Sequence, residues 1–375
     1  MKIEIKEVLD KKQLKAFIQL PYRLYNKNPY YVPPLKFDEE GTLRKDKNPA
    51  FDYCEARYWL AYKGDRVVGR VAGILNNAFI EKWQNKYLRF GWIDFEEDLN
   101  IAKALMFEVE NWAREKGMDA VHGPLGFTDL DHEGMLVHGF DQVGTLAAIY
   151  NYPYYPDFMD QLGYIKDVDW VEYQIRLSKK VPENLEKMAS IVMRRLNLSL
   201  VKAKKAKDIL PYTNEIFQLI NSAYADLYGV VPLTEKQIQY YTKQYFSFIK
   251  TAFVPLVLDS KGKLIAFGIT MPSLSIALQK ANGSLLPFGF AHILKALHKN
   301  NRADLYLVAV DKAYQGKGVN ALLMYEVNKT FVKMGIEYVE SNPELESNVK
   351  VQSIWDHYQA VQHKRRRCFI KQLAH

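Results

Sequence analysis

A glycine-rich turn in the last third of the chain has residue types suited to holding a phosphate group. It occupies residues 315–318 (QGKG), after an apolar run at 304–310 (DLYLVAV) and before an amphipathic stretch at 321–334. The run has the length and β-branched content of a buried strand, and the later stretch has helical periodicity. Glycines let backbone amides approach an anion, and the free N–H groups of a first helical turn carry partial positive charge. Lys317 adds a full charge, so the segment predicts a phosphate-binding site.

Two common phosphate-binding motifs do not fit this turn. A nucleotide P-loop ends in Gly-Lys-Ser/Thr, whereas Lys317 is followed by Gly318. The dinucleotide fingerprint has a third glycine and opens a βαβ unit, and no third glycine completes it here. The turn therefore indicates a phosphate-bearing ligand of another kind.

The turn resembles the pyrophosphate loop of the GNAT superfamily of acyl-CoA-dependent N-acyltransferases. That loop reads Gln/Arg-x-x-Gly-x-Gly/Ala and follows a strand whose backbone lines the pantetheine arm of the cofactor. Residues 315–318 match it, and Tyr314 stands where the family often has an aromatic residue. The sequence departs from the pattern at Asn320, where Gly or Ala is usual. The resemblance covers both halves of the chain in layout and is specific over about residues 304–340.

The resemblance implies that the co-substrate is acetyl-CoA or another acyl-CoA and that no metal is needed. It implies an acceptor amine on a small molecule or a peptide, and hence N-acyl transfer. Asn348 occupies the place of an asparagine that contacts the pantetheine arm in the family. The implied cofactor-binding residues are Val308, Val310, Gln315, Gly316, Lys317, Gly318, Val319, Asn320 and Asn348.

Acyl transfer to an amine needs proton transfer at both reacting ends and a stabilised carbonyl oxygen. A tyrosine in the helix after the next strand often serves as the acid in this family. The resemblance places Tyr358 in that role, in a helix expected over 349–361. Glu340, at the end of a strand beside the cleft, is the candidate base. The alternatives are a Tyr358 that only packs against the sheet and an exposed Glu340 without a role.

The elements that must position this site occur twice along the chain. Residues 104–121 and 322–339 both read as an amphipathic helix that ends at a glycine and is followed by a short strand. A hairpin pattern precedes each of them, at 58–74 and at 253–269. This order predicts an α/β fold, of the α+β kind with a mixed sheet.

Two tandem GNAT-like domains are therefore predicted, at residues 1–178 and 179–375. In the first, Asn100 aligns with Gly318, and the preceding segment 95–98 (FEED) is acidic and has no glycine. Such a segment repels a pyrophosphate group rather than binding it. We expect the first domain to be degenerate and the second to carry the acyl-CoA site.

Three further segments, an acidic loop, a basic run and an insertion, lie outside the family motif. Residues 129–133 (DLDHE) are expected to form a polar loop rather than a metal site, because no second histidine lies at helical spacing. The basic run 363–367 (HKRRR) is expected as the solvated entry to a last strand at 368–373, with an anionic partner as the alternative. The insertion at 281–302 is either a pocket-shaping loop or a surface excursion.

The length, composition and net charge of the chain restrict the class of protein. The chain has 375 residues, 48% hydrophobic and 25% charged, which fits a globular protein of two domains. It has two cysteines without metal-ligand spacing, and no apolar run approaches the roughly 20 residues that cross a bilayer. We therefore expect a cytoplasmic protein without a membrane span. A net charge of +8 favours anionic partners.

Three functions stay open from the sequence. The first is an N-acyltransferase with one working half. The second is a catalytically inactive GNAT-fold binding or scaffold protein, which the departure at Asn320 favours. The third is a basic adaptor for an acyl carrier protein or nucleic acid. Nucleic acid is the less expected of these partners, because aromatic and basic residues do not alternate along the chain.

Overall fold

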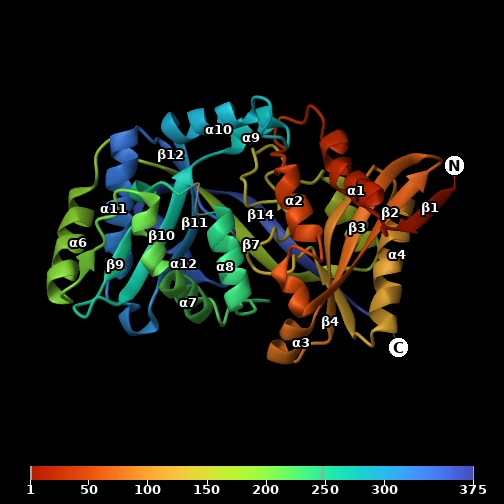
Figure 1. Cartoon of the computed structure of the whole chain (residues 1–375), viewed down its shortest axis with the longest axis horizontal. Helices are drawn as coiled ribbons and strands as arrows, with labels where there is room; N and C mark the ends of the chain where they lie inside the picture. The colour runs from red at the N-terminus through yellow and green to blue at the C-terminus, as the bar shows by residue number, and fades with distance from the viewer. Residues whose placement is uncertain (1, 246–248, 375) are drawn as a thin grey trace.

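Two similar α/β halves lie side by side and share one sheet (Figure 1). The computed structural model describes residues 2–245 and 249–374. The first half contains β1 (Ile3–Glu7), α1 (Lys11–Leu24), α2 (Lys36–Leu43), β2 (Cys54–Lys63), β3 (Arg66–Asn76), α3 (Asn77–Trp83), β4 (Tyr87–Phe95), α4 (Leu99–Glu115), β5 (Ala120–Gly123), β6 (Met135–His138), α5 (Tyr154–Gln161) and β7 (Ile165–Arg176).

The second half begins with helices and ends with the longest strand of the sheet. It contains α6 (Glu183–Arg195), β8 (Ser199–Leu200), α7 (Thr213–Ala223), α8 (Glu235–Tyr245), β9 (Leu256–Leu258), β10 (Leu264–Pro272), α9 (Ser275–Ala281), α10 (Gly289–His298), β11 (Arg302–Val310), α11 (Val319–Met334), β12 (Tyr338–Glu340), β13 (Glu344–Leu345), α12 (Val349–Gln352) and β14 (Gln359–Gln372).

The local signals of the sequence produce the predicted elements. The hairpin of β2 and β3 turns at Gly64, whose φ of +60° suits a glycine. Helices α4 and α11 are each followed by a left-handed glycine, Gly117 at φ +67° and Gly335 at φ +71°. Each helix then leads into a strand parallel to the one before it, so β4 pairs with β5 and β11 with β12. The mixed sheet is thereby confirmed.

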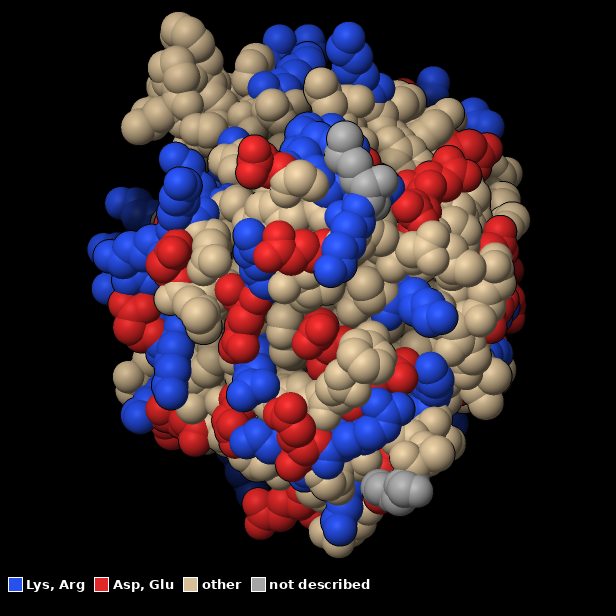
Figure 2. Space-filling model, turned by 90° about the vertical axis from the view of Figure 1, so that its right-hand side faces the viewer, with Lys and Arg blue, Asp and Glu red and all other residues tan. Residues whose placement is uncertain are grey.

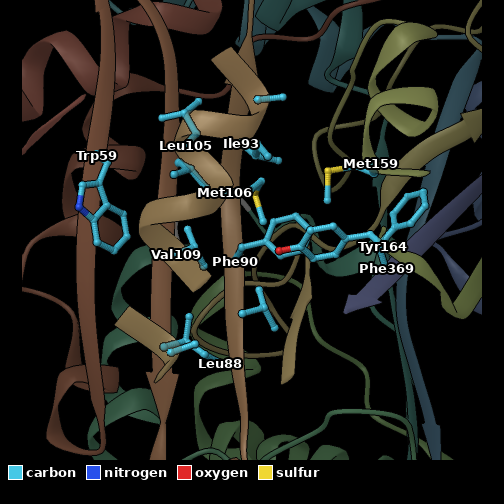
Figure 3. Packing of buried hydrophobic residues seen from close by; sticks show 14 of the residues in the cluster. Trp59, Leu88, Phe90, Ile93, Leu105, Met106, Val109, Met159, Tyr164 and Phe369 are labelled. Carbon is cyan, nitrogen blue, oxygen red and sulfur yellow. The ribbon is translucent and has the colours of Figure 1, made fainter. Parts of the chain in front are cut away.

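The last strand of each half pairs with the other half. The sheet order is β1-β2-β3-β4-β5-β14-β7-β12-β11-β10-β9-β8. Strand β14 lies between β5 and β7, and its Phe369 enters the hydrophobic core of the first half near Tyr164 and Met159 (Figure 3). The halves are thus joined by continuous main-chain hydrogen bonding, while the division at residues 178 and 179 stays a prediction.

The basic run before the chain end alternates between buried and partly buried residues, contrary to the expectation of a solvated strand entry. In β14, Lys364 and Arg366 are 0% and 1% exposed. Both pair with Glu172 of β7, at 2.9 Å from Lys364 Nζ and 2.5 Å from Arg366 Nε. Asp169 pairs with Arg367 at 2.8 Å. These cations form ion pairs within the sheet, because β14 lies beside β7, which carries Asp169 and Glu172.

We expect Glu172→Gln to destabilise the protein by about 3 kcal/mol, because removing one partner of a buried ion pair leaves the other charge uncompensated. Burial alone would raise the pKa of Glu172, but Arg366 and Lys364 lower it to about 2. The stability that the wild-type protein gains from the ionised Glu172 is therefore present above the ordinary carboxyl pKa of about 4.3. It is lost as the pH falls toward 2. Urea unfolding at several pH values measures it.

Glu55→Gln is the matched control, because Glu55 pairs with Lys116 at 2.6 Å on the exposed surface. Water screens that pair, so the unfolding midpoint should change little. Equal losses in the two variants would contradict the assignment of stability to the buried network.

Two other expectations differ from the structure. The helix expected over 349–361 is only the short α12 and a 3₁₀ turn at Trp355–His357, because β14 already begins at Gln359. The insertion at 281–302 contains helix α10, which packs with α9 at the top of Figure 1. Among the described helices, none has both the length and the apolar character needed to cross a bilayer.

Candidate active site

Strands β11 and β12 separate in the middle of the second half. They pair only from Arg302 opposite Tyr338 to Asp304 opposite Glu340. On its other side β11 has a bulge, since Leu307 lies opposite Ile269 while Leu305 lies opposite Thr270, which leaves Tyr306 as the extra residue. Beyond Asp304, β11 still pairs with β10 but no longer with β12, and the sheet opens on that side beside α11.

The predicted phosphate loop connects β11 to α11. Gly316 and Gly318 have φ of +72° and +87°, the left-handed region that glycine tolerates. No side chain caps the N-terminus of α11. The amides of its first turn are therefore available to an anion. A side chain at Gly318 would also meet Val192 of α6, with its Cβ 2.9 Å from Val192 Cγ2.

The corresponding helix end in the first half is filled by the protein itself. Asp98 caps α4 by accepting a hydrogen bond from the backbone amide of Asn100 at 2.9 Å. The same carboxylate pairs with Lys63 at 2.8 Å. A carboxylate at this helix end opposes a second anion, which agrees with the expectation that the first half has no cofactor site.

A cavity of about 230 Å³ runs between the open part of β11 and α11. It brings together three of the predicted cofactor residues, Val308, Asn320 and Asn348. Val310 and Val319 instead belong to the core between α11 and the sheet. The remaining ones, Gln315, Gly316, Lys317 and Gly318, form the loop before α11, where the Gln315 amide donates to the Val310 carbonyl at 3.1 Å.

The two predicted catalytic residues do not line this cavity. The Glu340 carboxylate pairs with Lys364 and lies 3.3 Å from His363 Nε2, facing a separate cavity of about 1030 Å³. The Tyr358 hydroxyl is 3.3 Å from the Asn328 amide, which donates to it. Burial raises the pKa of Tyr358. Their roles as base and acid stay predictions.

Tyr224, which sequence reasoning missed, reaches the cavity from the C-terminal end of α7. Its hydroxyl donates to the Val308 carbonyl at 2.9 Å and accepts from the Val308 amide at 3.2 Å. Burial raises the pKa of Tyr224 to about 12, so the hydroxyl stays protonated near neutral pH. Nothing in the local sequence marks this tyrosine, because α7 and β11 are far apart along the chain.

The acidic loop of the first half also enters the cavity. Asp129, Asp131 and Glu133 line it, and all three are partly buried. Burial raises the pKa of Asp129 and of Asp131 to about 6, although Arg89 opposes this at Asp129. Burial and the neighbouring Asp129 raise the pKa of Glu133 well above its ordinary value. The sequence marked these residues as a polar loop but did not reveal their burial.

A second cavity, of about 340 Å³, adjoins the first. The two share Asp129, Asp131, Ala147, Thr270, Tyr306, Leu307 and Asn342. Away from this shared region its wall is largely apolar, with Leu130 and Leu146 from the first half and Ile216, Phe217 and Ile220 from α7. The acidic loop thus lies where this second, largely apolar cavity meets the cavity beside β11.

Residues 214–355 match the sequence model of the Acetyltransferase (GNAT) family. The chain is 27% identical over 376 residues to Protein YghO of Escherichia coli (strain K12), with 98% of this chain and 95% of that protein covered. It is 25% identical over 374 residues to a bacterial ceramide synthase of Caulobacter vibrioides (strain NA1000 / CB15N), with 96% and 95% covered.

Solved structures of low sequence identity share the fold. A tandem GNAT protein from the clavulanic acid biosynthesis pathway superposes with a TM-score of 0.58 at 13% identity, over 99% of this chain and 98% of that one. A GCN5-related N-acetyltransferase from Sphaerobacter thermophilus gives a TM-score of 0.52 at 10% identity, over 99% and 95%. Residues 214–355 thus match the GNAT family, and the chain as a whole shares the fold of a solved tandem GNAT protein.

Proposed function

We propose that the protein transfers an acyl group from an acyl-CoA to an amine that carries a long aliphatic chain. The observation that carries this proposal is the meeting of two cavities at the partly buried carboxylates of Asp129 and Asp131. One cavity leads toward the glycine loop and the other is apolar. A reaction between two ligands would take place where the cavities meet.

In this proposal the second half binds the donor. The pyrophosphate group would be held by the loop amides at Gly316 and Gly318 and by Lys317. The pantetheine arm would follow the open edge of β11 past Val308, with Asn348 on the facing wall. The thioester then lies close to Tyr224, whose hydroxyl is hydrogen-bonded to the Val308 backbone.

The buried carboxylates suit the acceptor amine. An amine arrives mostly protonated, and a buried anion attracts the ammonium and then takes its proton. Asp129 shares a hydrogen bond with Glu133, and burial raises the pKa of both. A carboxylate with a pKa of about 6 is a stronger base than an exposed Asp and is still ionised at neutral pH. We assign Asp129, supported by Glu133, as the general base.

The reaction balances with these groups. The amine nitrogen forms a bond to the carbonyl carbon, and the carbon–sulfur bond breaks. The amine proton passes to the Asp129–Glu133 pair and from there to solvent, while the sulfur takes up a proton from solvent to leave as free CoA. The Tyr224 hydroxyl keeps its hydrogen bonds to the Val308 backbone and so holds the strand edge along which the donor would lie.

The apolar cavity supports an acceptor with a long chain. Each buried CH₂ group contributes roughly 0.8 kcal/mol, so an apolar cavity selects strongly for chain length. One relative of this chain is named a bacterial ceramide synthase, and a ceramide is the amide of a long-chain amine and a fatty acid. The name agrees with a lipid-like acceptor for this protein as well.

The test is amide formation, followed by mass spectrometry, from acyl-CoAs and a series of amines of increasing chain length. We expect kcat/KM to rise with acceptor length. Ile216→Trp, which fills part of the apolar cavity from α7, should shift the optimum to shorter amines, by roughly fourfold in kcat/KM per CH₂ lost.

Ile191→Trp is the control, because Ile191 lies on α6 outside both cavities and is 54% exposed. It should leave the chain-length profile unchanged. Equal rates with short and long amines would contradict a long-chain acceptor, and absence of any amide would contradict the proposed reaction.

A further inference from the structure

The helical hairpin of α9 and α10 has an unusual charge composition. Residues 273–302 contain four Lys and Arg residues, Lys280, Lys295, Lys299 and Arg302, and no Asp or Glu. All four are exposed. They line one cavity together with Asp141, Asp304 and Glu340 of other segments, while the segment itself adds only positive charge, which favours an anionic surface.

The hairpin also exposes large apolar side chains at its turn. We call Leu286, Phe288, Phe290 and Leu294 the apolar tip, with exposures of 76%, 72%, 47% and 51%. On the other face of α10, Ile293 and Leu297 are buried against α9 and hold the hairpin together. The tip is therefore not required for the packing of the hairpin itself. Clustered exposed apolar residues of this kind mark an interaction site.

The hairpin is held in place by the first half. The backbone amide of Lys36 donates to the Gly283 carbonyl at 3.0 Å. The Gln279 amide donates to the carbonyls of Pro29 and Tyr31 at 2.8 and 3.0 Å. The tip is thus presented from a fixed base, at the upper edge of the molecule where Figure 1 places α9 and α10.

The surface view agrees with this arrangement. Figure 2 shows a projection without Lys, Arg, Asp or Glu at the upper edge, and basic side chains gather beside it. Lower on the same face, basic and acidic side chains are interspersed. The combination of an uncharged projection with adjacent cations is confined to the upper part of this face.

We propose that the apolar tip inserts into the surface of an anionic phospholipid bilayer while Lys280, Lys295 and Lys299 contact the headgroups. A bilayer suits the tip better than a protein partner does. Its apolar side chains are exposed, as insertion between lipids requires, and they line none of the cavities described above. The cations complement anionic lipids. This inference stands on the hairpin alone and does not depend on the proposed reaction.

Vesicle flotation tests the proposal with the full chain. We expect binding to vesicles of phosphatidylcholine mixed with phosphatidylglycerol and much weaker binding to phosphatidylcholine alone. Each cation near an anionic surface strengthens binding roughly fivefold, so replacing Lys280, Lys295 and Lys299 by Gln should weaken it about a hundredfold. Leu286→Ser and Phe288→Ser should each weaken it about tenfold.

Matched variants distinguish the role of the hairpin from the general effect of removing positive charge or an exposed aromatic side chain. Lys202, Lys204 and Lys207 are exposed on the segment after β8, and their replacement by Gln removes the same charge. Phe107→Ser removes an aromatic side chain that is 57% exposed on α4. Both controls should keep nearly full binding, and circular dichroism confirms that each variant is folded.

A fluorescent label reports insertion directly. Both native cysteines, Cys54 and Cys368, are buried, so Leu286→Cys adds one reactive thiol at the tip. An environment-sensitive dye there should shift to shorter wavelength with anionic vesicles. No vesicle binding, equal losses in the hairpin and control variants, or binding only to an acyl carrier protein would each overturn the proposal.

Discussion

Asp129→Asn should lower kcat for amide formation by about a thousandfold, because a positioned general base contributes roughly 10²–10⁴-fold. The asparagine keeps the shape of the side chain but cannot accept the proton of the amine. Acyl-CoA binding, measured by calorimetry, should be unchanged, since the loop that we expect to hold the pyrophosphate belongs to the other half. The loss would therefore appear in kcat and not in the affinity for the donor.

The pH profile gives a second readout of the same group. The base must be ionised to act, so kcat should rise as the pH passes upward through about 6, the pKa that burial gives Asp129. Glu344→Gln is the comparison variant, because Glu344 lines the same cavity and burial raises its pKa to about 7. Its oxygen accepts from Trp355 at 3.0 Å, and a glutamine oxygen can do the same.

Asp129→Asn should also make the protein more stable at neutral pH. The pKa of Asp129 is raised from 3.8 to about 6 in the folded protein. Ionisation of Asp129 therefore opposes folding. The free energy of unfolding of the wild-type protein falls for this reason as the pH rises from about 4 to 6. A thermal midpoint that falls in Asp129→Asn, together with full activity, would contradict the base assignment.

Gly316→Asp should weaken acyl-CoA binding about a hundredfold. An added carboxylate beside the pyrophosphate costs on the order of 1–4 kcal/mol, depending on the local dielectric. Gly316 has φ of +72° and no heavy atom within 4 Å of a Cβ placed on it, so the new side chain has room. Calorimetry with CoA and with acyl-CoA measures the loss.

Gly262→Asp is the matched control for this substitution. Gly262 lies in the turn between β9 and β10 with φ of +80°, and it also has no neighbour within 4 Å. The backbone strain is therefore similar, while the phosphate loop is untouched. If both variants lose CoA binding equally, strain and not charge is responsible; if neither does, the cofactor is not held by this loop.

The strand, glycine loop and helix at 304–334 could be predicted from sequence because their signals are local. An apolar strand, two left-handed glycines and an amphipathic helix follow one another within about thirty residues. The same holds for the repeat, since α4 and α11 each end at a left-handed glycine before a parallel strand. These features require no knowledge of distant residues.

The basic run 363–367 shows where local signals fail. Composition favours an exposed position for consecutive cations. Strand β14 instead lies between β5 and β7, which places Lys364 and Arg366 against Glu172, nearly two hundred residues away in sequence. The pairing of distant strands decided the burial, and no periodicity in the run indicates it.

The sequence by itself determined the glycine turn that we expect to bind the donor, because Gly316 and Gly318, whose left-handed conformations shape the turn, both lie within it. Only the tertiary structure assembled the acceptor side of the proposed site. Asp129 and Asp131 come from a loop of the first half, Tyr224 from α7 and Val308 from β11. Desolvation raises the pKa values of Asp129, Asp131 and Tyr224, and contact between the two halves forms the cavity that these residues share with Val308. These physical effects exist only when segments far apart in the chain are packed together.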